Sequence, residues 1–238
     1  MGKAVLEDAL EYLPRGTLQR ILKKQSIYDS QCPSDRLYLV AAGRVKIAHT
    51  LEDGARIVAR FVSAEGLFNE SVLVPDRPQN QTAIALENTT VMSWTAAEVE
   101  QRIESEPRLG LALMQYTVRN CIELQDRIES MACYHTPKRV MLALINLGQQ
   151  LGTRTADGSK RVAWLSHLTI AEYVGTSREI VSVELNNLRR RGLLRYSRRY
   201  TDVYTEALED TLRADGVLPG YSSRSVFTAP AAKTSFHP

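Results

Sequence analysis

The sequence predicts an α+β protein with an N-terminal β domain, a long central helix and a C-terminal winged helix-turn-helix. Three features predict this fold class. Residues 26–94 form short β-rich runs separated by turn residues, residues 107–132 follow helical periodicity, and residues 168–194 contain two short helical patterns on either side of Gly175. The chain has 238 residues, of which 44% are hydrophobic, so it is long enough for two hydrophobic cores.

Charge is distributed unevenly along the chain. Residues 1–135 contain 15 Lys and Arg against 18 Asp and Glu, whereas residues 136–215 contain 13 against 9. The positive excess therefore coincides with the helix-turn-helix pattern, as phosphate binding would require.

The cysteines and the hydropathy of the chain exclude other classes of protein. Cys32, Cys121 and Cys133 are too few and too scattered for a disulfide scaffold. No apolar run approaches 18 residues, and the N-terminus lacks a signal sequence. We therefore expect a cytoplasmic protein with no membrane partner.

At the N-terminus, residues 4–25 predict one or two short helices interrupted at Pro14. Their apolar residues fall on two stripes at helical spacing: Leu6, Leu10 and Leu13, then Leu18, Ile21 and Leu22.

The next region is expected to be a β sandwich or barrel. Its predicted strands are Arg36–Ala42, Arg44–Thr50, Arg56–Val62, Gln81–Leu86 and Thr89–Trp94. Asp53-Gly54, flanked by alternating hydrophobic residues, predicts a hairpin turn.

The long helix over residues 107–132 is apolar on more than one side and so needs more than one neighbour. One stripe contains Leu111, Met114, Val118, Cys121, Gln125, Ile128 and Ala132. A second set is expected to face the β domain: Leu113, Tyr116, Leu124 and Met131. The alternatives are a buried core helix and a helix that pairs two subunits.

The C-terminal domain is expected to begin after a hinge at His135-Thr136-Pro137. A helix is predicted over residues 138–151, and short strands over 161–165, 193–196 and 201–205, which would add a wing to the helix-turn-helix. Residues 216–238, rich in Ser, Ala and Pro, predict a poorly ordered tail.

The two helices around Gly175 carry polar chemistry suited to DNA. We expect the second helix to start at Thr176, with Thr176 or Ser177 as its cap, and Gly192 can end it. Arg178 suits a bidentate bond to guanine, and Glu179 accepts from cytosine N4. The alternative is a helical hairpin with a solvated basic face.

The motif G-T-S-R-E-x-V-S-x-x-L-x-x-L-x-x-x-G-L-L, residues 175–194, resembles the cyclic AMP receptor protein / fumarate-nitrate regulator (Crp/Fnr) family of bacterial transcription factors. The resemblance extends more weakly over residues 15–205. It implies that Arg178 and Glu179 read a G and a C in each half-site. Val183 departs from the pattern, because the cyclic AMP receptor protein has a second base-contacting Arg there.

From the motif and the resemblance we expect a set of DNA-binding residues: Thr169, Thr176, Ser177, Arg178, Glu179, Ser182, Arg189, Arg198 and Arg199. Near the wing, Arg195, Arg198 and Arg199 are either phosphate contacts or solvated loop charges.

The resemblance also divides the chain. It implies a double-stranded β-helix, or jelly roll, with the N-terminal helices in residues 1–106, a central dimerisation helix and hinge in 107–135, and the DNA-binding domain in 136–215. Dimerisation would use Leu111, Met114, Val118, Cys121, Gln125 and Ile128.

An effector pocket is implied by the family, with these positions matching its cyclic-nucleotide site: Phe68, Asn69, Glu70, Gln81, Thr82, Leu124 and Gln125. The family's Gly is Asn69 here and its Arg is Gln81, which replaces a charge-assisted bond to phosphate with a neutral one. We therefore expect no response to cyclic AMP, unless Arg77 reaches in from its loop.

No cofactor is predicted. An iron-sulfur cluster needs about four thiolates, a haem has only His49 as a candidate His on the barrel, and no metal site is expected. For Cys121 and Cys133 we favour buried packing over a redox role.

The sequence thus predicts a homodimeric regulator that binds double-stranded DNA, with a small-molecule effector of unknown identity and RNA polymerase as a further partner. The alternative is a cyclic-nucleotide-binding module that contacts protein. An enzyme is excluded because no nucleophile elbow, P-loop, H-E-x-x-H or dinucleotide fingerprint is present.

Overall fold

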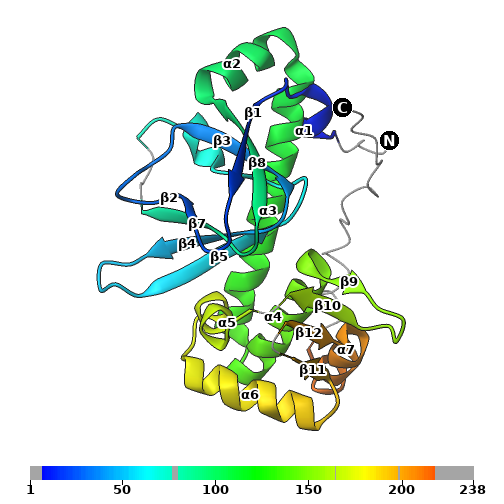
Figure 1. The fold of residues 1–238 in the computed structure, drawn as a ribbon. Coiled ribbons are helices and arrows are strands. Elements are labelled where there is room, and N and C mark those ends of the chain that lie inside the picture. Colours follow the sequence, from blue (N-terminus) through cyan, green and yellow to red (C-terminus); the bar gives the residue numbers. More distant parts are fainter. Residues whose placement is uncertain (1–6, 77–79, 164, 198, 218–238) are drawn as a thin grey trace.

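The computed structural model describes residues 7–76, 80–163, 165–197 and 199–217. Figure 1 shows a β domain and a winged helix-turn-helix domain joined by one long helix, α3 (Pro107–Cys133). The α+β class predicted from the sequence is confirmed, with the jelly roll, the long helix and the winged domain in the expected order.

Two antiparallel four-stranded sheets face each other in the β domain. The first has the order β1 (Thr17–Ile21), β8 (Thr89–Thr95), β3 (Arg36–Ala42), β6 (Leu67–Phe68). The second has the order β2 (Ser26–Tyr28), β7 (Gln81–Ala85), β4 (Val45–Thr50), β5 (Arg56–Val62). Buried side chains from both sheets, among them Val40, Val45 and Phe68, form the core between them.

The predicted N-terminal helices are largely wrong. α1 covers only Ala9–Tyr12, and residues 17–21 form β1, which pairs with β8 along its whole length. Ile21 is buried, whereas Leu18 is 61% exposed, so the apparent helical stripe does not share one face. Cross-strand hydrogen bonds to β8 outweigh the helical spacing of a few leucines. Leu6 lies outside the described residues.

The predicted hairpin at Asp53-Gly54 is confirmed. It joins β4 to β5, and Gly54 has φ = +81°, a left-handed conformation that favours glycine. The strands β2 and β6 were not predicted, because two or three residues are too short to show an alternating pattern. A short 3-10 helix, η1 (Glu70–Leu73), follows β6.

α2 (Ala96–Ser105) and α3 cover the outer face of the first sheet (Figure 1). α2 begins at a capping box formed by Thr95 and Glu98. The N-terminal half of α3 buries Leu109 and Leu113 against this sheet, in the same cluster as Trp94. The opposite face of α3 has no covering element among the described residues.

The C-terminal domain contains α4 (Thr136–Leu151), β9 (Thr153–Arg154), β10 (Lys160–Ala163), α5 (His167–Val174), α6 (Arg178–Arg190), β11 (Leu194–Tyr196), β12 (Tyr200–Val203) and α7 (Thr205–Ala214). Its sheet has the order β11-β12-β10-β9, which confirms the wing. α4 begins two residues earlier than expected, directly after His135.

The strand predicted over residues 201–205 ends at Val203, because Thr205 starts α7, which was not predicted. Leu208 and Leu212 of α7 are buried in the domain core with α4, so this helix is part of the domain. Residues 218–238, which include most of the predicted tail, lie outside the described residues. Within the described part of the chain, no helix is both long and apolar enough to cross a membrane.

Candidate nucleic-acid interface

The turn between α5 and α6 is set by one glycine and one serine. Gly175 ends α5 with φ = 74° and ψ = 51°, and its N–H donates to the Ala171 carbonyl over 2.8 Å. The Ser177 Oγ accepts from the Ile180 N–H over 3.3 Å and caps α6. Ser177 is therefore the cap, and the expectation that the helix starts at Thr176 is wrong, because α6 begins at Arg178.

One face of α6 is buried and the other is open to solvent. Val181, Leu185 and Leu188 pack into the domain core. Arg178 and Glu179, in the first turn, are exposed. Figure 1 shows α6 at the end of the molecule opposite the β domain. The two predicted base-reading side chains thus lie where a DNA major groove could reach them.

Ser182, also predicted to bind DNA, is held within the protein. Its Oγ donates to the Arg178 carbonyl over 2.8 Å and lies 2.8 Å from Nδ1 of His167. Because the hydroxyl has a single proton and donates it to the carbonyl, His167 donates from Nδ1. Partial burial, and then the positive charge of Arg178, lower the pKa of His167. This contact braces α5 against α6.

Thr169 lies in the first turn of α5. Its N–H donates to the capping Ser166 Oγ over 3.0 Å, and its own Oγ1 is 2.9 Å from that Oγ. Thr169 therefore sits at a helix N-terminus, a position where DNA phosphates are commonly bound.

The basic end of α6 is supported by the wing. The Arg189 guanidinium lies 5.2 Å from the centre of the Tyr196 ring, and the Tyr196 hydroxyl donates to Oδ1 of Asn186 over 3.0 Å. Arg190 is exposed and donates to Asn187. The charges of Arg189 and Arg190 therefore remain on the surface next to the predicted reading face.

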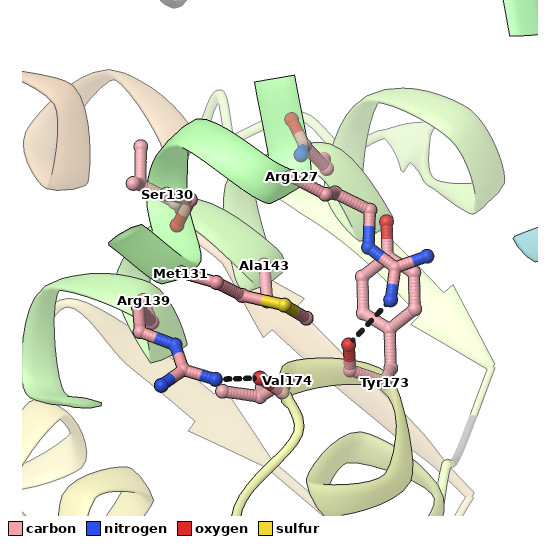
Figure 2. A pocket seen from close by; sticks show the side chains of 9 residues that line it. Arg127, Ser130, Met131, Arg139, Ala143, Tyr173 and Val174 are labelled. Atoms are coloured by element: carbon pink, nitrogen blue, oxygen red, sulfur yellow. Dashed lines mark hydrogen bonds between the residues drawn. The ribbon is translucent and has the colours of Figure 1, made fainter. Parts of the chain in front are cut away.

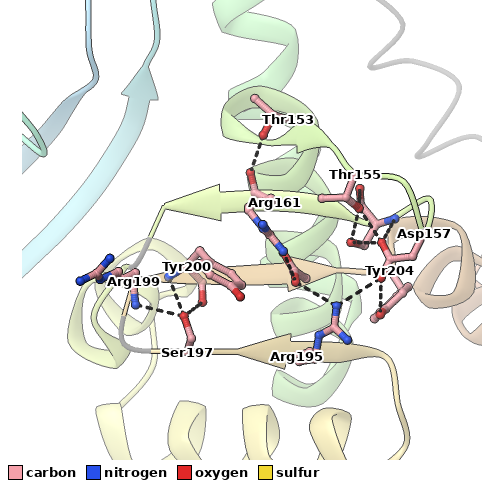
Figure 3. A network of polar contacts seen from close by, with 11 residues as sticks. Thr153, Thr155, Asp157, Arg161, Arg195, Ser197, Arg199, Tyr200 and Tyr204 are labelled. Atoms are coloured by element: carbon pink, nitrogen blue, oxygen red, sulfur yellow. Dashed lines mark hydrogen bonds and ion pairs between the residues drawn. The ribbon is translucent and has the colours of Figure 1, made fainter.

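In the wing, Asp202 is fully buried and pairs with Arg161 and Arg195, two of the residues in the polar network of Figure 3. Arg161 forms a bidentate pair with it, with distances of 2.6 and 2.9 Å. Arg195 lies 3.3 Å from both Asp202 and Asp157. The Arg195 side chain is 63% exposed but already paired with two carboxylates, which the sequence analysis did not anticipate. Its role as a phosphate contact stays a prediction.

The turn between β9 and β10 is stabilised by Asp157. Hydrogen bonds from Thr155 and Ser159 lower the pKa of this carboxyl well below its usual range.

At the opposite end of the wing, Arg199 is exposed and its backbone N–H donates to Ser197 Oγ over 3.1 Å (Figure 3). Arg198 lies outside the described residues.

The interior of the β domain is filled by stacked aromatic rings. The ring centres of Tyr38 and Phe68 are 5.0 Å apart and those of Tyr28 and Tyr38 are 5.8 Å apart, and all three side chains are buried. The Tyr28 hydroxyl donates to Oε1 of Gln81 over 2.8 Å. The expected pocket residues Phe68 and Gln81 are therefore linked through a tyrosine that the sequence analysis did not single out.

Asn69 and Glu70, also expected in the pocket, are committed to protein partners. Asn69 has φ = 66°, and its amide donates to the carbonyls of Ser34 and Arg36 over 3.3 and 2.7 Å. Both Glu70 oxygens lie 2.7 Å from Nη2 of Arg60. No sequence pattern pointed to Arg60, because its role depends on the packing of β5 against η1.

The remaining expected pocket residues are Thr82, Leu124 and Gln125. Thr82 is half-buried on β7. Leu124, expected to face the β domain, is 46% exposed, and Gln125 is exposed. The expectation for Leu124 is wrong, because the C-terminal half of α3 extends beyond the barrel. Arg77 lies outside the described residues.

Where α3 passes between the two domains, Arg127 binds backbone carbonyls from both, and Figure 2 shows its bond to Tyr173. It donates to the Val58 and Tyr173 carbonyls over 3.1 and 2.9 Å and also to Ala59, and it lies 4.4 Å from the centre of the Tyr173 ring. The neighbouring cavity, lined by Arg139 among others, has a volume of about 20 Å³, room for one water molecule.

Cysteine and histidine residues do not assemble a metal centre in the described residues, where no group of three His, Cys, Asp or Glu could hold an ion. His49 pairs with Asn80 over 3.3 Å. Cys121 and Cys133 are exposed, so the expectation of buried packing is wrong for the single chain.

Two family models match this chain. The cyclic nucleotide-binding domain matches residues 18–106, and the Crp-like helix-turn-helix domain matches residues 138–211.

Among known proteins, the chain is 25% identical to the CRP-like cAMP-activated global transcriptional regulator of Mycobacterium tuberculosis over 163 residues, 68% of this chain and 73% of the relative. It is 24% identical to the global nitrogen regulator of Synechocystis over 184 residues, 76% of this chain and 82% of the relative.

Solved structures agree with the fold. A CRP family transcriptional regulator from Thermus thermophilus has a TM-score of 0.67 at 26% identity, covering 81% of this chain and 95% of that chain. FixK2 from Bradyrhizobium japonicum has a TM-score of 0.70 at 22% identity, covering 82% and 96%.

Proposed function

Because the chain belongs to the Crp/Fnr family of transcription regulators, with a helix-turn-helix DNA-binding domain, we propose that it is a homodimer that reads a pseudo-palindromic DNA site and does not respond to cyclic AMP. One observation carries the proposal: Arg178 and Glu179 are exposed in the first turn of a capped helix whose other face is buried.

The chemistry of that turn matches direct reading of bases. Arg178 would donate two hydrogen bonds to guanine O6 and N7, and Glu179 would accept one from cytosine N4. Thr169 at the start of α5 and the exposed Arg189 and Arg199 would bind phosphates and so fix the register on the duplex. The positive excess of residues 136–215 favours the same partner.

The exposed face of α3 supports the homodimer. It presents an apolar stripe, in which Leu111 is 41%, Met114 58%, Val118 52% and Ile128 66% exposed. Cys121 and Gln125 lie on the same stripe and are exposed as well. A contiguous apolar surface of this kind is unfavourable in water and is buried when the helix pairs with its copy.

A twofold axis along α3 would set the geometry on DNA. Two copies of α6 would enter successive major grooves about 34 Å apart on a pseudo-palindromic site. The regulator would act in the cytoplasm and affect transcription through contact with RNA polymerase.

The contacts in the β domain argue against cyclic AMP. The stacked rings of Tyr28, Tyr38 and Phe68 occupy the interior, and Glu70 is paired with Arg60. Gln81, at the position where the resemblance implies an Arg for the phosphate, has no positive charge and accepts from Tyr28. The negative charge of a bound cyclic phosphate would therefore lack the arginine that the resemblance implies as its partner.

Selection of duplexes from a genomic fragment pool, repeated at several salt concentrations, tests DNA reading. We expect one pseudo-palindromic sequence to be enriched, and we expect the protein still to prefer it at high salt, because base contacts are less sensitive to salt than phosphate contacts. Enrichment of no sequence, with only salt-sensitive background binding, would contradict the proposal.

Calorimetry with cyclic AMP and cyclic GMP tests the sensor domain and also the second candidate function, a cyclic-nucleotide-binding module that contacts protein. That candidate is favoured by the match of residues 18–106 to the cyclic nucleotide-binding domain. We expect no heat of binding for either nucleotide. If the protein binds a nucleotide and prefers no DNA duplex, the result would favour the cyclic-nucleotide-binding module.

A further inference from the structure

The exposed face of α6 contains an apolar residue among polar ones. Val183 is 58% exposed, and at helical spacing it shares a line with Glu179, Asn186 and Arg190, all exposed. The core residues Val181, Leu185 and Leu188 lie on the opposite face. Val183 therefore points away from its own domain.

Ile180 enlarges this apolar spot. It is 43% exposed and lies three residues before Val183, so the two side chains are neighbours on the helix surface. The described part of the chain packs against α6 through α4, α5 and β11, and it leaves both side chains open to solvent. β-branched residues are also poor helix formers, so neither helix stability nor core packing accounts for Val183.

We infer that Val183, flanked by Ile180, reads the 5-methyl group of a pyrimidine in the major groove, normally that of thymine. This inference rests on the proposed reading of DNA by α6. Among unmodified bases only thymine presents a methyl group there. A valine can neither donate nor accept a hydrogen bond, so a guanine or adenine edge facing it would lose its hydrogen bonds to water without replacement.

The position of the methyl follows from the helix. Glu179 and Val183 are one turn apart, about 5–6 Å between Cβ atoms. Successive base pairs rise about 3.4 Å. The thymine should therefore lie one or two base pairs from the C·G pair read by Glu179, once in each half-site.

Replacing thymine by uracil removes this methyl alone. In the duplex chosen by selection, each thymine of one half-site is replaced in turn, and affinity is measured at fixed salt. We expect one position, beside the C·G pair, at which wild-type protein binds about fourfold more weakly, the contribution of one buried methyl group. Placing 5-methylcytosine or cytosine at that position distinguishes recognition of the methyl group from recognition of the thymine base. We expect the protein to bind the duplex with 5-methylcytosine more tightly than the duplex with cytosine.

Two variants assign the effect to the side chain. The Val183→Ala variant should fold normally because the position is exposed, and we expect it to bind the thymine and uracil duplexes equally. Arg199→Ala, at an exposed wing residue, should lower affinity for both duplexes while keeping the fourfold ratio. Circular dichroism establishes that each variant is folded.

The outcomes separate the two proposals. If wild-type protein binds a preferred palindrome but tolerates uracil at every position, the methyl-reading role is overturned and DNA reading stands. Loss of the uracil effect in Arg199→Ala, or its retention in Val183→Ala, would also overturn it. If selection enriches no duplex, both proposals fail.

Discussion

The Nζ of Lys46 lies 3.1 Å from Oε2 of Glu172, which joins strand β4 of the β domain to helix α5 of the helix-turn-helix. Only 10% of the lysine side chain and 12% of the glutamate side chain are exposed. Beside this pair, Phe61 of β5 contacts the Tyr173 ring with the ring centres 5.2 Å apart. The DNA-reading domain is therefore docked on the β domain through both charge and apolar contact.

Breaking this pair should destabilise the protein. Lys46→Ala leaves Glu172 charged and nearly buried without its partner, so we expect the free energy of unfolding in urea to fall by about 2–3 kcal/mol. Lys23→Ala, which removes an exposed lysine from the same domain, is the control and should change it by less than about 0.5 kcal/mol. Equal losses in the two variants would contradict a role for the pair.

The predicted division between base and phosphate contacts can be measured directly. Arg178→Ala should weaken binding to the preferred site by about 1–3 kcal/mol and relax specificity at one base pair. Arg199→Ala should weaken binding to preferred and scrambled duplexes alike and reduce the salt slope by about 1. Equal losses on both duplexes for both variants would contradict this division of roles.

The apolar stripe of α3 predicts the oligomeric state. Ile128→Glu places a charge in the expected interface twice, so we expect the dimer dissociation constant, measured by analytical ultracentrifugation, to rise on the order of 100-fold. Since Ile128 is 66% exposed in the single chain, the monomer should remain folded. Gln101→Glu, at an exposed position on α2, is the control. An unchanged dissociation constant for Ile128→Glu would place the interface elsewhere.

The lowered pKa of His167 predicts a pH dependence. In the folded state burial and Arg178 disfavour the protonated ring, so the unfolded chain binds this proton more readily. The contribution of His167 to stability is present above the usual His pKa of about 6.5 and decreases as the pH falls below it. Arg178→Ala should raise the pKa of His167, as measured by NMR titration. A pKa that does not move would exclude the charge of Arg178 as a cause.

The helix-turn-helix was the most predictable part of the molecule. Gly175, Ser177 and Gly192 act locally, through backbone conformation and capping, and such signals are visible within a few residues of sequence. The Asp53-Gly54 hairpin was predictable for the same reason. The extent of α3 was also predicted well, since a long helix repeats its pattern over many turns, whereas Leu124 and Met131, expected to face the β domain, are exposed.

Contacts made across long sequence separations were not predictable. The strand β1 is specified by its pairing with β8, about 70 residues away, which helical spacing around Ile21 cannot indicate. Nothing near Lys46 or Glu172 in the sequence marks them as a pair, because their 126-residue separation is closed only by domain docking. The pairing of Arg195 with Asp157 was not predictable either, because the two residues are 38 positions apart in the sequence.

Arg127 holds the junction by binding main-chain oxygens of Val58, Ala59 and Tyr173. Every amino acid supplies a carbonyl, so a change of side chain at position 59 would leave that acceptor in place. Substitutions at the residues around the junction should therefore leave the orientation of α6 relative to the β domain unchanged, as long as Arg127 is retained.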